Sequence, residues 1–185
     1  MLLRKTGAKP VQEVWASLVE RYPNAVALSR APLEDIEEVV GVLGLKKRAT
    51  ALREAARTIV EETGGEVIAD PEFLQSLPGI GDYATAAVLS FAWDVRAVTI
   101  DVNAARVYSR IGGFLPNTLR QGLAYARVVA ETVATETNHK EVNYGVLDLA
   151  AQVCRPRPLC SSCPALAVCE YGAAIVGSAR TEGKG

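Results

Sequence analysis

The four cysteines are the densest chemical feature of the chain. Cys154, Cys160, Cys163 and Cys169 all lie in CRPRPLCSSCPALAVC, with the spacing C-x5-C-x2-C-x5-C. A four-cysteine zinc site usually combines two C-x2-C pairs, and this segment has one, so the spacing favours a cubane iron–sulfur cluster held by a wrapped loop. A zinc site and unligated thiols are the alternatives. Disulfides are not expected in a chain that we predict to be cytoplasmic.

The stretch LPGIGDYATAAV, at residues 77–88, is the second feature. Pro78 fixes its own φ angle, and Gly79 and Gly81 permit backbone angles closed to other residues, which predicts a tight hairpin at 77–81. Apolar residues then recur at helical spacing, so a helix should follow at once. The N–H groups at the start of that helix attract a phosphate, but a helical corner that binds nothing has the same local sequence.

Helices must position both features, because the 3.6-residue period runs through almost the whole chain. We therefore predict an all-α fold. The expected helices cover residues 11–22, 32–43, 45–63, 71–77, 82–93, 102–111, 118–136 and 139–153. The stretch 97–100 is extended, but one short run does not make a sheet. It leads to Asp101, which is expected at the N-cap of the next helix.

Composition narrows the class of protein further. The 185 residues suit one domain or two small interlocked ones, and 49% hydrophobic residues can form a sizeable core. No stretch has the roughly 20 apolar residues of a membrane span, and no signal peptide is visible, so we expect a cytoplasmic protein with no membrane partner. The net charge of −1 is not that of a simple nucleic-acid coat, but clustered basic residues could still form one DNA-binding face.

Taken in order, these features resemble the helix-hairpin-helix DNA glycosylases of the endonuclease III and MutY superfamily. The matching stretches are LLRKT, LGLKKRA, LPGIGDYATAAV, IDVNAARVYSR and NYGVLDLAAQVC. The resemblance implies two interlocked helical domains: a bundle with the hairpin at residues 7–113, and an iron–sulfur domain made of 1–6 plus 114–171. We expect residues 172–185 to be a disordered tail.

The resemblance also implies the chemistry. It makes Asp101 the catalytic carboxylate and places Tyr83 near a flipped nucleotide. Endonuclease III-type relatives carry a lysine at the position of Tyr83 and attack the sugar through a Schiff base, which a phenol cannot form. We therefore predict a monofunctional base-excision glycosylase, resembling the mismatch-specific thymine and uracil enzymes. The alternatives are an adenine glycosylase of MutY type, acting on A·G or A·8-oxoguanine, and an inactive DNA-binding iron–sulfur protein.

Partners and further residues are carried over from the same resemblance. The partner is double-stranded DNA with a mismatched or damaged base, bound by a monomer at the nucleoid. The cofactors are a 4Fe-4S cluster on the four cysteines and a monovalent cation on the hairpin carbonyls. The DNA-binding residues are Lys5, Lys47, Arg48, Gly79, Gly81, Arg155 and Arg157. Asn143 and Asp148 are predicted to be buried polar anchors of a helix, and His139 to be a surface or helix residue and not a ligand.

Overall fold

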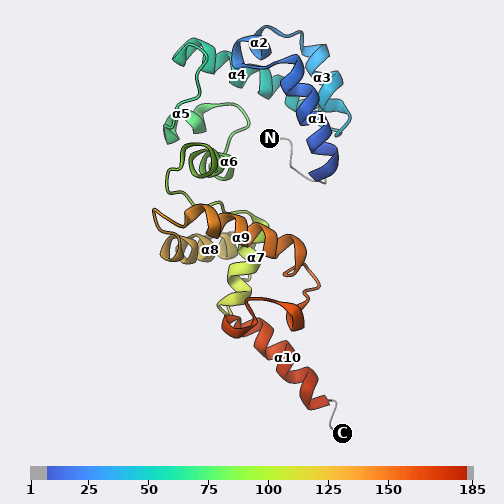
Figure 1. Cartoon of the computed structure of the whole chain (residues 1–185), viewed down its shortest axis with the longest axis vertical. Helices are drawn as coiled ribbons and strands as arrows, with labels where there is room; N and C mark the ends of the chain where they lie inside the picture. The colour runs from blue at the N-terminus through green and yellow to red at the C-terminus, as the bar shows by residue number, and fades with distance from the viewer. Residues whose placement is uncertain (1–7, 183–185) are drawn as a thin grey trace. The chain divides into compact units, whose positions relative to one another are not determined.

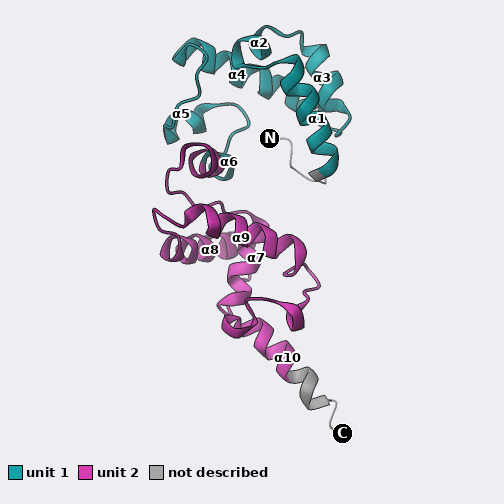
Figure 2. Cartoon of the chain, viewed as in Figure 1, with its two compact units in different colours: residues 1–85 teal, residues 86–185 magenta. Residues whose placement is uncertain are grey.

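Helices are the regular secondary structure in the part of the chain that a computed structural model describes, residues 8–182, and no strand occurs in that range (Figure 1). The prediction of an all-α fold is confirmed. Within the same range no helix is both long and apolar enough to cross a membrane. Contacts divide the chain into two compact units, residues 1–85 and 86–185 (Figure 2).

The first unit is built on an apolar core. Its helices are α1 (Ala8–Arg21), α2 (Ala25–Arg30), α3 (Leu33–Gly41), the 3₁₀ turn η1 (Lys46–Arg48), α4 (Ala49–Thr63), α5 (Pro71–Ser76) and the start of α6 (Asp82–Ala87). Helix α4 packs against α2 and α3, and α1 packs against α3. The buried side chains of this core are Val11, Val14, Leu18, Ala31, Ile36, Val39, Val40 and Ala49.

Helix α2 was not predicted, because six residues are too few to show a periodic apolar face. The structure shows what starts it. The Asn24 side chain accepts a hydrogen bond from the Ala27 N–H at 2.8 Å, which caps the first turn. The predicted end of α4 at the glycine pair is confirmed, with Gly64 in the left-handed conformation at φ +71°.

The second unit surrounds α7 (Val102–Ile111). It also contains the π-helical turn η2 (Val88–Ala92), α8 (Leu119–Val133), α9 (His139–Gln152), the 3₁₀ turns η3 (Cys160–Ser162) and η4 (Leu166–Val168), and α10 (Glu170–Glu182). Helix α7 packs against α8, α9 and α10. Small side chains fill the contact between α7 and α8, including Ala105 and Ala126. The segment 97–100 has neither helix nor strand, as expected.

Helix α10 continues to Glu182, and disorder of the tail from residue 172 stays a prediction. That prediction relied on the polar end of the sequence. The preceding residues form the helix: the Ala173 N–H donates to the Cys169 carbonyl at 2.9 Å, and Gly172 is buried. The domain boundaries predicted at 7–113 and at 1–6 plus 114–171 stay a prediction, since residues 1–7 lie outside the described part.

Candidate active site and cysteine loop

Asp101 is the N-cap residue of α7, as predicted. Its Oδ1 accepts hydrogen bonds from the backbone N–H groups of Asn103, at 2.9 Å, and of Ala104, at 2.8 Å. The Asn103 side-chain amide donates to Oδ2 at 2.9 Å. Three donors fix the carboxylate in one orientation, while the side chain is only partly buried. Capping therefore holds the carboxylate without enclosing it, and an exposed face remains available for chemistry.

A second layer of polar contacts lies behind Asp101. The Arg106 guanidinium donates to the Asn103 Oδ1 at 3.0 Å, so the amide that holds Asp101 is itself held. The same guanidinium donates through Nε to the Cys154 carbonyl at 2.8 Å and through a terminal nitrogen to the Ala150 carbonyl at 3.4 Å. These bonds connect the start of α7 to the end of α9, where the cysteine loop begins.

The three polar residues predicted on α9 have different environments. Asn143 is buried, as predicted, with 3% of its surface exposed. Asp148 is exposed, so its prediction as a buried anchor was wrong: its side chain lies on the solvent side of α9. His139 is a helix residue, at the first position of α9, and is buried there, with 1% of its surface exposed. Its ring is buried because Ser90 on η2 offers it a hydrogen bond, 2.8 Å from Nδ1.

The hairpin at 77–81 forms as a tight turn between α5 and α6. The Ile80 N–H donates to the Leu77 carbonyl at 3.0 Å, and Gly79 has φ +81°, which favours glycine. Gly81 does not have a positive φ, so Gly79 is the glycine of this pair that uses the wider range of backbone angles. A Cβ atom at Gly81 would meet no atom within 4 Å. The space over the start of α6 is therefore open.

Tyr83 lies in the first turn of α6, directly after the hairpin, and 38% of its surface is exposed. An exposed phenol at a helix start can stack on a base or donate a hydrogen bond. Tyr83 belongs to the first unit and Asp101 to the second, and their predicted roles as catalytic-site residues stay predictions.

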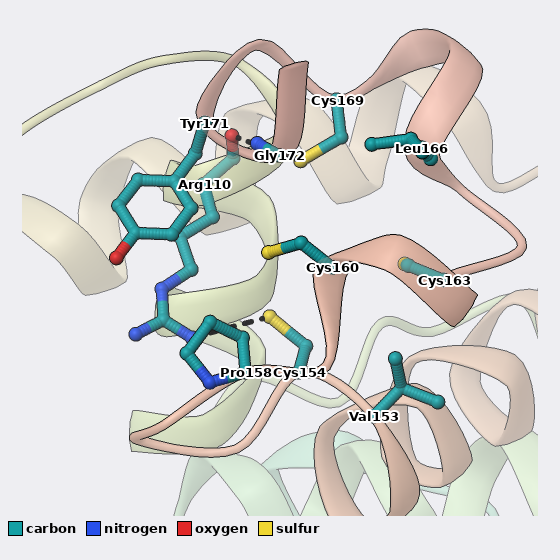
Figure 3. A pocket seen from close by; sticks show the side chains of 10 residues that line it. All are labelled: Arg110, Val153, Cys154, Pro158, Cys160, Cys163, Leu166, Cys169, Tyr171 and Gly172. Carbon is teal, nitrogen blue, oxygen red and sulfur yellow. Dashed lines mark hydrogen bonds between the residues drawn. The ribbon is translucent and has the colours of Figure 1, made fainter. Parts of the chain in front are cut away.

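All four cysteines line one small cavity of about 20 Å³ in the second unit (Figure 3). Cys154 follows α9, Cys160 opens η3, Cys163 ends it, and Cys169 precedes α10. The wall is completed by Arg110, Val153, Pro158, Leu166, Tyr171 and Gly172. The four thiols are free of disulfides. The four side chains therefore face one cavity in the folded chain, and their role as metal ligands stays a prediction.

Two sulfur atoms already receive hydrogen bonds. The Gly172 N–H lies 3.3 Å from the Cys169 Sγ, and the Arg110 guanidinium lies 3.5 Å from the Cys154 Sγ. Arg110 also donates to the Arg155 and Pro156 carbonyls, at 2.6 and 3.0 Å, and covers the ring of Tyr171 at 4.8 Å. Donors of this kind are what thiolate ligands of a metal centre use.

The surroundings of Cys160 favour its neutral thiol. Burial, and then the neighbouring Cys169, Cys163 and Cys154, raise the pKa of the Cys160 thiol. Among the described residues, no three His, Cys, Asp or Glu side chains lie close enough to hold a single metal ion. A mononuclear zinc site needs four sulfurs about 2.3 Å from one centre, whereas the thiolates of a four-iron cluster bind separate iron atoms and lie further apart. Ligation of an iron–sulfur cluster by the four cysteines stays a prediction.

The basic residues predicted to bind DNA are spread over both units. Lys47 lies exposed on η1, and the neighbouring Arg48 is half-buried. Arg155 and Arg157 lie exposed in the loop between Cys154 and Cys160. Lys5 lies outside the described residues. Contact of these residues with DNA stays a prediction.

Comparison with known proteins identifies the family. Residues 1–128 match the profile of the HhH-GPD superfamily base excision DNA repair proteins. The chain belongs to this superfamily. Among HhH-GPD relatives, a thymine/uracil-DNA glycosylase of Pyrobaculum aerophilum is 36% identical over 171 residues, which cover 89% of this chain and 74% of the relative. The human adenine DNA glycosylase is 32% identical over 174 residues, covering 91% of this chain but 32% of that protein.

Solved structures agree with that assignment. A thermostable thymine-DNA glycosylase superposes with a TM-score of 0.82 at 28% identity, covering 94% of this chain and 81% of the other. A non-covalent endonuclease III–DNA complex superposes with a TM-score of 0.81 over 95% and 82% of the two chains, at 23% identity, which shows the shared fold. This HhH-GPD protein is a base-excision repair DNA N-glycosylase, and DNA is its partner.

Some site residues of this HhH-GPD protein were not identified from the sequence. Arg106 and Arg110 make most of the bonds between α7 and the cysteine loop, yet neither was singled out. A signal was present: Asn103, Arg106 and Arg110 lie three and four residues apart, and so share one face of a helix that begins at a candidate catalytic aspartate. The Ser90–His139 contact had no such signal, because 49 residues separate the pair.

Proposed function

We propose that this DNA glycosylase removes thymine or uracil paired with guanine, by hydrolysis of the N-glycosidic bond, and leaves an abasic site. The observation that carries the proposal is Tyr83, an exposed phenol directly after the hairpin, at the position where an imine-forming lysine would stand. The similarity to enzymes named thymine/uracil-DNA glycosylase, at 36% identity, supports the choice of base.

In this proposal Asp101 supplies the catalytic charge. Loss of the base develops positive charge on the sugar, and an anionic carboxylate beside the anomeric carbon stabilises that transition state and orients the attacking water. The three hydrogen bonds to Asp101 support this role, because a carboxylate that is already oriented need not reorganise during the reaction. The target nucleotide has to leave the base stack to reach it.

Because position 83 carries no amine, the reaction should stop at the abasic site. Without a Schiff base the sugar is not opened, so the DNA strand stays intact until it is treated with alkali. Borohydride should therefore trap no covalent enzyme–DNA complex with the wild-type protein. The variant Tyr83→Lys places an amine at this position, and a trapped complex with that variant alone would support the assignment; trapping with the wild type would refute it.

The excised base is tested with one panel of duplexes carrying G·T, G·U, A·G and A·8-oxoguanine. Alkali-labile sites in the G·T and G·U duplexes are the expected result. The adenine alternative is favoured by the 32% identity to enzymes named adenine DNA glycosylase, and it predicts cleavage of the other two duplexes. No product on any duplex, with intact DNA binding, would support the alternative of an inactive binding protein.

DNA is held, in this proposal, by one phosphate site and several basic side chains. The hairpin N–H groups at Gly79 and Gly81 would take a backbone phosphate, and the open space beside Gly81 supports a close approach. A monovalent cation on the hairpin carbonyls would balance part of the phosphate charge. The side chains expected to contact other phosphates are Lys5, Lys47, Arg48, Arg155 and Arg157. The enzyme is proposed to act as a monomer.

The second cofactor in the proposal is a 4Fe-4S cluster on Cys154, Cys160, Cys163 and Cys169. The single cavity that these residues line, and the N–H donors to two of their sulfurs, support it. When bound, a cluster would join four points of the 154–169 loop and give broad visible absorbance. Purified protein should be brown, with iron and acid-labile sulfide in equal amounts. Colourless protein containing zinc would overturn the assignment.

A further inference from the structure

The segment that leads to Asp101, residues 94–101, has an unusual backbone environment. Residues 94–101 run from the π-helical turn η2 to the start of α7 with no strand beside them, so their N–H and C=O groups need other partners. The side chain of Asn143, on α9, supplies partners for two of them. Its Oδ1 accepts from the Thr99 N–H at 2.9 Å, and its Nδ2 donates to the Ala97 carbonyl at 2.8 Å. One side-chain amide thus makes two hydrogen bonds to the backbone of the kind that a neighbouring strand would make.

The opposite side of this segment is fixed by apolar burial. In extended backbone, successive side chains point to opposite faces. Val98 and Ile100 are 4% and 9% exposed and belong to the core of the second unit. Thr99 points the other way, and its hydroxyl also donates to the Asn143 Oδ1, at 3.2 Å. The peptides that end at Asp101 are therefore held between a hydrophobic contact and one polar side chain.

The orientation of the Asn143 amide is fixed in turn by Ser90. Nδ2 donates to the Ser90 Oγ at 3.0 Å, so the serine proton is free to go to the His139 Nδ1 at 2.8 Å. His139 then carries its own proton on Nε2, which faces the Asp94 carboxylate at 3.5 Å. Turning the amide over would set Oδ1 against the Ala97 carbonyl and Nδ2 against the Thr99 N–H. Only one orientation satisfies all partners.

Rare backbone conformations gather at the same place. Ser90 lies in the π-helical turn Val88–Ala92, an element that often marks functional sites. Asp94 has φ +58°, the one positive φ at a non-glycine residue in the described part of the chain. Such conformations persist where the surroundings over-determine them. Here the surroundings are the contacts of Asp94 with His139 and with Lys140, whose Nζ lies 2.9 Å from Oδ1.

We propose that Asn143 is a positioning residue for base excision, which holds the 97–101 segment so that the Asp101 carboxylate is in place before DNA arrives, and that Ser90 and His139 hold Asn143. This inference rests on the proposed catalytic role of Asp101. Asn143 acts through the backbone of Thr99 and Ala97, and it has no contact with the substrate in this scheme. The chain Ser90–Asn143–Thr99 therefore predicts an effect on rate and not on DNA affinity.

The test compares Asn143→Leu, which keeps the side-chain size, with Ser90→Ala and with the exposed control Asp148→Asn on the same helix. Single-turnover base release is measured with enzyme in excess over a duplex of the panel, at a temperature where circular dichroism shows each variant folded. We expect the rate to fall at least about tenfold for Asn143→Leu and less for Ser90→Ala, with the control unchanged. The Kd for a duplex carrying a tetrahydrofuran abasic analogue should change less than about threefold.

Full wild-type rates for folded Asn143→Leu and Ser90→Ala, with lowered melting temperatures alone, would overturn the inference and leave a structural role. If Asn143→Leu does not fold, Ser90→Ala and Thr99→Val decide in its place by the same criterion. Asp101→Asn is measured in parallel to separate the two proposals. Activity in that variant would refute the proposed function, whereas an inactive Asp101→Asn beside a fully active Asn143→Leu would refute the positioning role alone.

Discussion

The cores of the two units are built from different kinds of side chain. The core of the first unit is a cluster of aliphatic residues from α1, α3 and α4. The second unit has aliphatic residues too, but it also buries Ser90, Thr99, Ser109, His139 and Asn143. In the described part of the chain, the other buried polar side chain is that of Thr85, at the end of the first unit.

This difference indicates that the core of the first unit mainly stabilises the fold, whereas the core of the second unit also orients particular groups. Burial of aliphatic side chains is non-directional and stabilises a helix bundle without fixing any one group to within a fraction of an ångström. Buried hydrogen bonds are directional, and leaving one unmade costs about 1–3 kcal/mol, so they select a single arrangement. Four of the polar side chains of the second core, those of Ser90, Thr99, His139 and Asn143, lie in or beside the segment that ends at Asp101. The directional contacts are therefore found where a reactive group has to be oriented.

The largest expected effect is a loss of base release in a variant of Asp101. Asp101 is one of two aspartates that cap a helix in different units. Asp101→Asn should lower single-turnover base release by roughly a thousandfold or more, because a neutral amide cannot balance the charge that develops on the sugar. Asparagine is as good an N-cap as aspartate, so α7 should stay folded.

Asp70 is the matched control for this substitution. It caps α5 in the first unit, where its Oδ1 accepts from the Phe73 N–H at 2.7 Å. Asp70→Asn should leave the rate of base release and the circular dichroism spectrum as in the wild type. Equal loss of activity in the two variants would mean that the effect is not specific to the charge of Asp101.

The second prediction concerns the apolar core. Ile36 is fully buried in the first unit, so Ile36→Ala should lower the free energy of unfolding by about 2–5 kcal/mol in urea titrations. The rate of base release by the protein that remains folded should not change, since Ile36 orients no polar group. Val42→Ala, at a side chain that is 80% exposed, serves as control and should shift stability by no more than about 0.5 kcal/mol. Slower base release by folded Ile36→Ala would contradict the inference that the first core stabilises the fold without orienting reactive groups.

The comparison also explains which features could be predicted from the sequence. Long helices such as α4 and α8 were predicted well, because a helix that buries one face must repeat apolar residues with its own period. The cap at Asp101 was predicted because the carboxylate bonds to N–H groups two and three residues away. The four cysteines could be grouped from the sequence because they lie within one loop. Each of these features is encoded by residues close together in the chain.

The features that were missed depend on partners far away in the sequence. Nothing near His139 indicates that it is buried, since its partner Ser90 is 49 residues earlier. Asp148 and Asn143 look alike in the sequence, and only the packing of α9 decides that one is exposed and the other buried. Likewise, Arg110 reaches loop carbonyls 45 and 46 residues along the chain. These long-range polar contacts are those that complete the candidate site.

A smaller effect should appear at high pH, in the second core. Burial raises the pKa of Tyr108 to about 12, while the unfolded chain has a tyrosine pKa of about 10. The unfolded state therefore loses its proton first. The stability contributed by neutral Tyr108 is complete below about pH 10 and is lost as the pH rises through about 12, with a total of roughly 1–3 kcal/mol. Urea titrations from pH 9 to 12 should show a steeper loss for the wild type than for Tyr108→Phe, and parallel profiles would contradict the assignment.

The smallest expected effects test whether both units contact DNA. Lys47 lies exposed in the first unit and Arg155 in the second. If each contacts one phosphate, Lys47→Ala and Arg155→Ala should each weaken binding severalfold at low salt and reduce the slope of log K against log salt by about one. Phosphate contacts made independently are additive, so the double variant should reduce the slope by about two. Fluorescence anisotropy over a salt series measures both quantities. A reduced slope for only one of the variants would assign the tested DNA contact to that unit. The two units would then differ in their DNA-binding surfaces as well as in their cores.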